Sequence, residues 1–196
     1  MKLIALTGLH GAGKDTVADA LPARKLAFAD VLYLEVAEAF GIRLDRLKDR
    51  STKELPLISL QIVRCADIGL LDFLPPRTDW SADRSPRQIL QWWGDYRRAQ
   101  DPGHFVKELR AKLSYISCQV PWPSDVVITD CRFPNEARMV RQLGGQVWQV
   151  VRPGHEPPRT GHASETTGDE FAPDVVLVND GTLEELRAKA LKEWEK

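Results

Sequence analysis

A glycine-rich segment near the start of the chain, Gly8 to Thr16, directly follows the apolar run Leu3–Leu6. Its letters, GLHGAGKDT, fit the pattern G-x-x-x-x-G-K-[ST] at Gly8, Gly13 and Lys14. In such a loop the backbone N–H groups converge on an anion, the lysine reaches the β- and γ-phosphates, and the following helix points its N-terminus at the site. The alternative is a chance glycine-rich turn. Because a buried strand is expected before the segment and a helix after it, we interpret it as a phosphate-binding loop (P-loop).

The loop departs from the general pattern at Asp15, which stands where a serine or threonine is usual, while a hydroxyl follows only at Thr16. A carboxylate is a hard oxygen ligand that suits Mg²⁺, directly or through water, and Thr16 can hydrogen-bond a phosphate from the first helical turn. We therefore expect a nucleotide site with an altered metal contact. The residues expected to bind the nucleotide are Gly8, Gly11, Ala12, Gly13, Lys14, Asp15 and Thr16.

Composition limits the class of protein. The chain has 196 residues, enough for one substantial core with room for small insertions. Lysine and arginine number 27 against 28 acidic residues, so the net charge of -1 provides no broad cationic surface, and direct binding to nucleic acid is not expected. Three cysteines without C-x-x-C spacing favour a reducing cytoplasm. Every apolar run is shorter than the roughly 18 residues of a membrane span. We expect a soluble cytoplasmic protein without membrane contact.

Short runs rich in valine and isoleucine alternate with segments of helical periodicity, which is typical of buried parallel strands. The pattern predicts an α/β fold, a doubly wound parallel sheet in three α/β/α layers. The expected strands are Leu3–Thr7, Val126–Thr129, Gln146–Val151 and Asp174–Val178, with one more short strand at Ala27–Ala29.

We expect a single domain over residues 1–196 with two inserted segments. Residues 41–84 are poorly patterned and are interpreted as an acceptor-binding insertion, with a helix over Leu57–Leu70. Residues 152–168 are rich in proline and glycine and are interpreted as a lid or mobile loop. Helices are further expected over Val31–Phe40 and Gly103–Ile116.

The last helix is expected to begin at Thr182, whose hydroxyl forms a capping box with Glu185. Its apolar residues recur at helical spacing and are expected to be buried. They are Leu183, Leu186, Ala190 and Trp194.

A helix over Pro86–Ala99 has the clearest start in the chain: Ser85 as N-cap, proline at the first helical position and Gln88 three residues after the cap. Helical spacing gives it a core face and a polar face. The core face carries Ile89, Trp93 and Tyr96, and the polar face carries Arg87, Gln91, Gly94 and Arg98.

Arg87 and Gln91 lie one turn apart on the polar face of that helix. An arginine can clamp a phosphate through two hydrogen bonds, and an amide can bond the edge of a base. The P-R-x-x-x-Q arrangement resembles the acceptor-site helix of adenylate kinases and related nucleoside monophosphate kinases. The alternative is a solvated polar face. Trp92, Trp93 and Tyr96 are interpreted as core residues rather than as base-stacking residues.

A second site is expected where the strand Val126–Thr129 ends in Asp130. P-loop enzymes place there a carboxylate that orients Mg²⁺, and Arg132 lies close enough in sequence to reach a transferring phosphate. Asn135 and Glu136 stand at the start of the next helix, where either capping or a ligand role is open.

Two loops later in the chain carry polar side chains. Cationic residues between Arg152 and Glu165 could neutralise phosphate charge, and a zinc site at His155 and His162 is not expected because no cysteine joins them. Asn179 follows the last strand in a turn whose backbone is expected to flank the donor base.

Taken in order, six segments resemble the bacteriophage deoxynucleoside monophosphate kinases over nearly the full chain. They are Gly8–Thr16, Phe28-Ala29-Asp30, Ser85–Gly94, Asp130-x-Arg132-Phe133-x-Asn135-Glu136, His162-x-Ser164-Glu165 and Asn179-x-Gly181-Thr182. The resemblance implies transfer of the γ-phosphoryl group of ATP to a deoxynucleoside monophosphate. It also makes the pair Asp15-Thr16 ordinary for the family. After Gly94 the family usually has threonine and an acidic residue, whereas Asp95-Tyr96 follows here, so the assignment of Arg97 and Arg98 stays open.

The resulting hypothesis places ATP in the P-loop with Lys14 at its β/γ oxygens and Mg²⁺ at Asp15 and Asp130. The catalytic residues are expected to be Lys14, Arg87, Asp130 and Arg132. The expected substrate-binding residues are Asp30, Arg87, Gln91 and Arg98. No general base is required, because an acceptor phosphate is already anionic near pH 7.

Two other functions stay open at this point: a P-loop kinase for another small acceptor, such as a coenzyme precursor, and a non-catalytic ATP-binding regulatory protein. The sequence does not determine the preferred base or the oligomeric state, and a homodimer is compatible with it.

Overall fold

The structure is a computed structural model that describes residues 2–118, 125–155 and 171–196. The chain divides into two compact units. Unit 1 consists of the residues up to Phe28 together with those from Leu109 onward, and unit 2 consists of Ala29–Glu108. The proposed insertion at 41–84 falls within unit 2, and residues 156–168 of the proposed lid lie outside the described residues.

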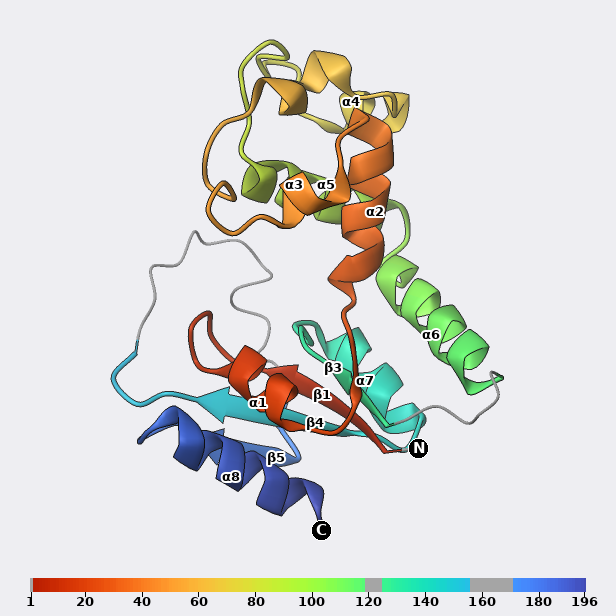
Figure 1. Cartoon of the computed structure of the whole chain (residues 1–196). Helices are drawn as coiled ribbons and strands as arrows, with labels where there is room; N and C mark the ends of the chain where they lie inside the picture. The colour runs from red at the N-terminus through yellow and green to blue at the C-terminus, as the bar shows by residue number, and fades with distance from the viewer. Residues whose placement is uncertain (1, 119–124, 156–170) are drawn as a thin grey trace. The chain divides into compact units, whose positions relative to one another are not determined.

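A five-stranded parallel sheet forms the centre of unit 1 (Figure 1). The strand order is β2-β3-β1-β4-β5, so β1 is central and its neighbours are β3 and β4. Parallel pairing requires crossover connections, and those from β1 to β2, from β2 to β3 and from β3 to β4 contain helices. The predicted α/β fold is therefore confirmed. The strands are β1 (Leu3–Thr7), β2 (Arg24–Leu26), β3 (Val126–Ile128), β4 (Gln146–Val151) and β5 (Val175–Val178).

The prediction of the short strand β2 was wrong in position, because it lies at Arg24–Leu26 and not at 27–29. Arg24 and Lys25 are exposed, so this edge strand lacks the apolar pattern that the sequence analysis relied on. Phe28 is buried, but its N–H donates to the Asp130 carboxylate at 2.8 Å and not to a neighbouring strand. The apolar residues at 27–29 thus indicate burial beside the sheet.

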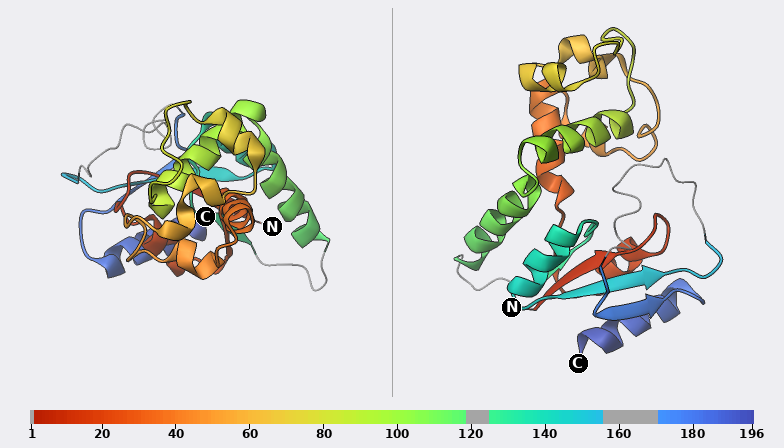
Figure 2. Two further views of the ribbon diagram at one scale, coloured as in Figure 1. Left: turned by 90° about the horizontal axis from the view of Figure 1, so that it is seen from above. Right: turned by 180° about the vertical axis from the view of Figure 1, so that it is seen from behind.

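Helices cover both faces of the sheet (Figures 1 and 2). On one face α1 (Lys14–Ala20) and α8 (Leu183–Trp194) pack against alternate strand residues, since successive side chains of a strand point to opposite sides. On the other face α7 (Pro134–Gln142) packs close to Leu3. The core of the first face is Ile4, Leu6, Ala12, Val17, Ala18, Leu21, Val127, Trp148, Val150, Leu177, Leu186, Ala190 and Trp194.

The capping box predicted for the last helix is present. The Thr182 hydroxyl accepts from the Glu185 N–H at 3.2 Å, and the Glu185 carboxylate accepts from the Thr182 N–H at 2.8 Å. The prediction that Leu183 is buried was wrong, because this residue is 55 % exposed. As the first residue of α8 it precedes the turn at which the apolar stripe meets the sheet.

Unit 2 is helical. Its helices are α2 (Ala29–Phe40), α3 (Leu44–Lys48), α4 (Ile68–Phe73) and α5 (Pro86–Gln100), with short 3₁₀ turns η1 (Ile58–Leu60) and η2 (Ile62–Arg64). The following helix, α6 (His104–Ser117), begins in unit 2 and ends in unit 1. The predicted helix at 86–99 is confirmed as α5, with its core face at Ile89, Trp93 and Tyr96 buried.

The predicted helix over Leu57–Leu70 was wrong. Leu60 and Ile62 are both fully buried, and residues two apart cannot share one face of an α-helix. Two 3₁₀ turns achieve this burial instead, and α4 begins only after Asp67, whose carboxylate caps the Leu70 N–H at 3.1 Å.

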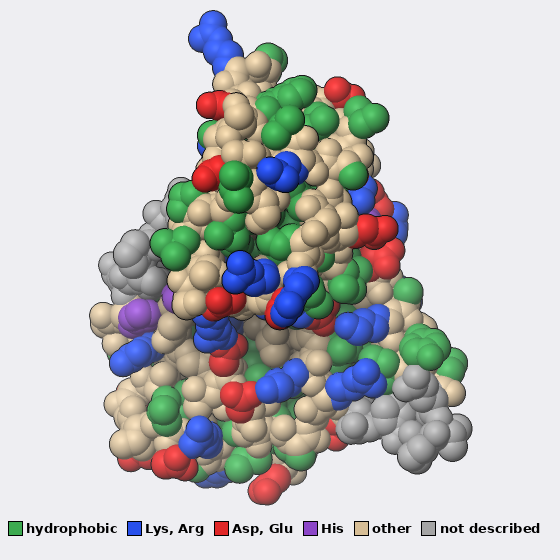
Figure 3. Space-filling view, turned by 45° about the horizontal axis from the view of Figure 1, so that its top comes forward, with side chains coloured by type: hydrophobic (Ala, Val, Ile, Leu, Met, Phe, Trp, Pro, Cys, Tyr) green, Lys and Arg blue, Asp and Glu red, His purple; other side chains and the backbone are tan. Residues whose placement is uncertain are grey.

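Several large hydrophobic side chains of unit 2 are exposed to solvent, and Figure 3 shows hydrophobic side chains at the surface. They include Leu55, Ile58, Val63, Ile68 and Trp80. Within the described ranges, no helix is long and apolar enough to cross a membrane.

Candidate active site

The P-loop connects the C-terminal end of β1 to the N-terminus of α1, as the sequence predicts. Gly13 precedes α1 with φ of 112°, a left-handed conformation that L-residues with side chains rarely adopt. A Cβ at this position would lie 2.8 Å from Leu186 Cδ2 and 2.9 Å from Asn179 Nδ2. Both the backbone conformation and the close packing therefore require glycine here.

Lys14 is the first residue of α1, and its ammonium folds back over the loop. Nζ donates to the carbonyl oxygens of Gly8 at 2.7 Å and Leu9 at 2.8 Å. Burial, and then the positive charge of Arg132, lower the pKa of Lys14 from 10.5 to about 8, while Asp15 and Asp130 act in the opposite direction. A desolvated ammonium among backbone carbonyls is poised to gain from an incoming anion.

Asp130 lies beside Lys14 at the C-terminal end of β3. Its Oδ1 accepts a hydrogen bond from the Phe28 N–H at 2.8 Å, which orients the carboxylate. The next residue, Cys131, is bonded to β1, because its N–H donates to the Leu6 carbonyl at 3.0 Å. Carboxyl ends of adjacent parallel strands meet at one edge of a sheet, so the loop after β3 and the P-loop share that edge.

The electrostatic coupling to Lys14 shows that the structure brings together four of the predicted site residues in unit 1. They are Lys14, Asp15, Asp130 and Arg132. With the Lys14 ammonium, the Arg132 guanidinium can neutralise phosphate, and the two carboxylates can hold a divalent cation.

Glu136 is nearly fully buried at the start of α7, which confirms its capping function. Its Oε2 accepts from the backbone N–H groups of Arg132 at 2.7 Å and Phe133 at 3.1 Å. The carboxylate thereby fixes the backbone that carries Arg132.

The Cys131 thiol lies near this carboxylate. Burial is the main cause that raises the pKa of the thiol, and Glu136 and Asp130 add to the effect, so this cysteine is not an activated nucleophile.

Two side chains from the loops after β4 and β5 reach the P-loop backbone. Asn179 Nδ2 donates to the Ala12 carbonyl at 2.9 Å, a side-chain contact that the sequence analysis did not anticipate. His155 Nε2 lies 2.8 Å from the His10 carbonyl oxygen. The sequence offers no signal for either contact, since each joins residues more than 140 positions apart. His162, Ser164 and Glu165 lie outside the described residues.

In unit 2, the polar face of α5 carries the predicted acceptor residues. The Ser85 hydroxyl accepts from the Gln88 N–H at 3.2 Å and so begins the helix as predicted. The Arg87 guanidinium pairs with the carboxylate of Glu54, an exposed side chain. Gln91 follows one turn later and is half-buried. An arginine that holds a carboxylate here presents donors that match a phosphate equally well.

Arg98 completes this face. Its guanidinium lies over the Phe105 ring, 4.9 Å from the ring centroid, and crosses Gly94. A Cβ at Gly94 would be 2.8 Å from the nearer Arg98 nitrogen, so glycine leaves the space in which the guanidinium lies. Asp30 stands in the first turn of α2, where its carboxylate is 3.7 Å from the Lys48 ammonium.

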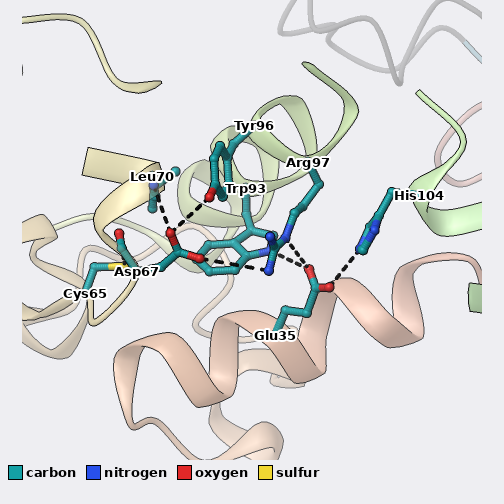
Figure 4. Close-up of polar contacts among 8 residues, drawn as sticks. All are labelled: Glu35, Cys65, Asp67, Leu70, Trp93, Tyr96, Arg97 and His104. Carbon is teal, nitrogen blue, oxygen red and sulfur yellow. Dashed lines mark hydrogen bonds and ion pairs between the residues drawn. The ribbon is translucent and has the colours of Figure 1, made fainter. Parts of the chain in front are cut away.

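A second polar cluster, the Glu35 network, joins α2, α5 and the start of α6 (Figure 4). The Glu35 carboxylate accepts from Trp93 Nε1 at 2.7 Å and from Arg97 Nε at 3.1 Å, and His104 Nε2 lies 2.8 Å away. The sequence analysis missed Glu35 and His104 entirely, because nothing in the local pattern pairs residues 69 positions apart.

Asp67 extends this network on the other side of Trp93 and Tyr96 (Figure 4). Its carboxylate accepts from the Tyr96 hydroxyl at 3.0 Å and lies 3.9 Å from an Arg97 nitrogen. Burial, and then this hydrogen bond, raise the pKa of Tyr96. Arg97 is thus held between two carboxylates and over two aromatic rings, which indicates a structural role for it.

Among the described residues, no group of three or more histidine, cysteine, aspartate or glutamate side chains is arranged to hold a metal ion.

Comparison with solved structures addresses the fold. The structure of TT1252 from Thermus thermophilus has a TM-score of 0.50 and 20 % identity, over 99 % of this chain and 97 % of that one. A dephospho-CoA kinase from Campylobacter jejuni has a TM-score of 0.49 and 13 % identity, over 99 % and 96 % of the two chains. At these identities the likeness concerns the fold alone.

Sequence comparison identifies the family. The model of the family "Deoxynucleotide monophosphate kinase" matches residues 103–190. A protein of Acanthamoeba polyphaga mimivirus, named as a candidate deoxynucleotide monophosphate kinase, is 32 % identical over 201 residues, which cover 97 % of this chain and 95 % of the relative. The resemblance drawn from the ordered motifs is thereby confirmed, and the chain belongs to the deoxynucleotide monophosphate kinase family.

Proposed function

We propose that the protein transfers the γ-phosphoryl group of ATP to a deoxynucleoside monophosphate and releases the diphosphate. Membership of a P-loop kinase family implies ATP as the donor. The observation that carries the proposal is the Lys14 ammonium, desolvated over the P-loop and flanked by Asp15, Asp130 and Arg132.

In the donor site, the P-loop N–H groups and the N-terminus of α1 bind the phosphates, while Lys14 leaves its carbonyl partners for the β/γ oxygens. Arg132, held by Glu136 through its own backbone, neutralises charge on the transferring group. No residue has to remove a proton from the acceptor, whose phosphate is already anionic near pH 7. Catalysis then consists of positioning and charge neutralisation.

Asp15 and Asp130 fit a magnesium ion. Both carboxylates lie close enough to Lys14 to raise its pKa, and Mg²⁺ is usually held by one or two carboxylates together with phosphate oxygens, which supports this assignment. When bound, the ion neutralises charge that develops on those oxygens. The Phe28 N–H keeps the Asp130 carboxylate oriented for this role.

The acceptor is proposed to bind on the polar face of α5. Arg87 holds the monophosphate in the way it now holds Glu54, and Gln91, one turn further, reads the edge of the base. Arg98 adds positive charge to the same face, and Asp30 binds the acceptor from α2. Arg97 is excluded from this set because Glu35 and Asp67 occupy it.

A coupled assay of ADP release with Mg²⁺-ATP and a panel of deoxy- and ribonucleoside monophosphates tests the proposal. Turnover that depends on a monophosphate and falls at least about 10²-fold in Lys14→Ala is expected, the scale for loss of a preorganised charge. Lys25→Ala, which removes an exposed lysine of the same unit, is the matched control. ATP binding without turnover of any monophosphate would favour another acceptor or a regulatory protein.

Two acceptor-site variants refine the result. Arg87→Ala is expected to raise KM for the monophosphate about tenfold or more, because a bidentate charge-assisted contact is lost. Gln91→Ala is expected to change the ranking of the four bases at little cost to ATP affinity. An unchanged ranking would contradict a base-reading role for Gln91. Arg43→Ala, in an exposed ion pair of the same unit, controls for loss of charge alone.

The proposal also includes a cytoplasmic location, where ATP and nucleoside monophosphates are present, and association into a homodimer. Sedimentation velocity over a range of concentrations tests the dimer. A monomer at every concentration would contradict it.

A further inference from the structure

His155 reaches the P-loop through a short turn after β4. Strand β4 is the parallel neighbour of β1, so the chain leaves β4 at the same edge of the sheet as the P-loop. The His155 N–H donates to the Arg152 carbonyl at 3.2 Å, and Gly154 adopts φ of 70°, which reverses the chain. This turn brings the His155 ring back to the tip of the loop.

The ring makes a directed hydrogen bond there. His155 Nε2 lies 2.8 Å from the His10 carbonyl oxygen. A carbonyl oxygen can only accept, so Nε2 carries the hydrogen, in either the neutral or the protonated ring. The contact is close packed, because a Cβ at Gly11, which has φ of 78°, would lie 2.7 Å from the same nitrogen. The imidazole thus occupies the space that a side chain at position 11 would fill.

The bond has a consequence for the donor groups of the loop. In a trans peptide the carbonyl of one residue and the N–H of the next point in opposite directions. Fixing the His10 carbonyl on His155 therefore also fixes the direction of the Gly11 N–H. Asn179 acts on the Ala12 carbonyl in the same way at 2.9 Å, which sets the direction of the Gly13 N–H.

We infer that His155 is a positioning residue of the ATP site, which holds the tip of the P-loop by the His10 carbonyl so that the Gly11 N–H stays aimed at the phosphates. This inference rests on the proposed role of the loop as the donor site. Because a peptide plane that is already oriented loses less freedom on binding, the contact raises ATP affinity without touching the acceptor.

Three substitutions at one position test the inference by direct calorimetric titration with ATP. His155→Ala is expected to weaken ATP binding about threefold to tenfold, the range for one neutral hydrogen bond. In His155→Gln the amide nitrogen can take the place of Nε2, and affinity is expected to return to within about twofold of the parent. In His155→Asn the amide nitrogen takes the place of Nδ1, too short to reach, and affinity is expected to match the alanine variant.

Further measurements separate positioning from folding and from the proposed reaction. The three variants are expected to unfold at the same denaturant concentration, and KM for ATP is expected to follow the calorimetric affinities while KM for the monophosphate stays constant. Unchanged ATP affinity in His155→Ala, or equal recovery by asparagine and glutamine, would overturn the inference. Calorimetry needs no acceptor, so failure of every monophosphate in the assay would overturn the proposed reaction and leave this result standing.

Discussion

Replacement of Lys14 by methionine is expected to stabilise the ligand-free protein while it abolishes turnover. Burial holds the pKa of Lys14 at about 8, down from 10.5. The protein must therefore keep a charged ammonium in a place that disfavours charge. Methionine has similar length and no charge, so the change removes this cost and leaves most of the packing intact.

The magnitude follows from linkage between protonation and folding. A pKa that falls from 10.5 to about 8 corresponds to about 3 kcal/mol, at roughly 1.4 kcal/mol for each pKa unit. The two hydrogen bonds to Gly8 and Leu9 are also lost, which takes back about 2 kcal/mol at about 1 kcal/mol for each bond. The expected gain in the free energy of unfolding at pH 7 is therefore about 1 kcal/mol.

The stability difference between Lys14→Met and the parent depends on pH in a direction that the pKa shift determines. The folded pKa of Lys14 lies below the unfolded one, so between pH 8 and 10.5 the unfolded chain binds more protons than the folded protein does. The free-energy cost of keeping Lys14 charged in the folded protein is therefore present in full below about pH 8, and it disappears as the pH rises toward 10.5. The stability advantage of methionine should shrink over the same window.

Urea denaturation of the parent and Lys14→Met at pH 7 and pH 10 measures both effects, because other groups that titrate at high pH cancel in the difference. Lys25→Met, at an exposed lysine, is expected to change stability by less than about 0.5 kcal/mol at either pH. A variant less stable than the parent at pH 7, or a gain that is equal at both pH values, would refute the argument that Lys14 is unfavourably desolvated.

Three other changes test unit 2 and the acceptor site proposed there. Glu54→Ala removes the carboxylate that pairs with Arg87 and is expected to lower KM for the monophosphate severalfold; a higher KM would mean that Glu54 itself contacts the substrate. Gly94→Ala is expected to displace the Arg98 guanidinium and raise KM for the monophosphate but not for ATP, and equal effects on both would argue against a local displacement. Glu35→Gln is expected to lower the free energy of unfolding by about 1–3 kcal/mol in urea, since charge-assisted bonds are lost, and an unchanged midpoint would contradict this.

The strands of the sheet could be predicted where burial gave an apolar run. β1 and β3 are buried along their whole length, and both were found close to their observed bounds. β2 was misplaced because two of its three residues face solvent, so its only signal was the pairing with β3, which a sequence read alone does not show. In unit 2 the helix predicted over residues 57–70 was wrong for a different reason, because 3₁₀ turns bury residues at spacings that match no regular period.

The donor site could be predicted more fully than the contacts that support it. Lys14 and Asp130 follow neighbouring strands of a parallel sheet, so topology alone brings their segments to one edge. The supporting contacts of Asn179 and His155 depend on how loops return to that edge, and no local pattern encodes this. Motifs thus predict the groups that we propose to act on phosphate, while the contacts of Asn179 and His155 with the loop backbone are found only in the structure.

The sequence does not show which of the two adjacent arginines on α5, Arg97 or Arg98, belongs to the proposed acceptor site. Their packing in the structure distinguishes them. Residues one position apart on a helix point about 100° apart, so Arg97 and Arg98 cannot share a face. Arg97 lies with Trp93 on the buried side, where Glu35 and Asp67 compensate its charge. Arg98 falls on the face of Arg87 and Gln91, where Gly94 leaves room for it. The carboxylates that hold Arg97 therefore stabilise the core side of the helix, and this anchoring fixes the orientation of the opposite, polar side, on which we propose that the acceptor binds.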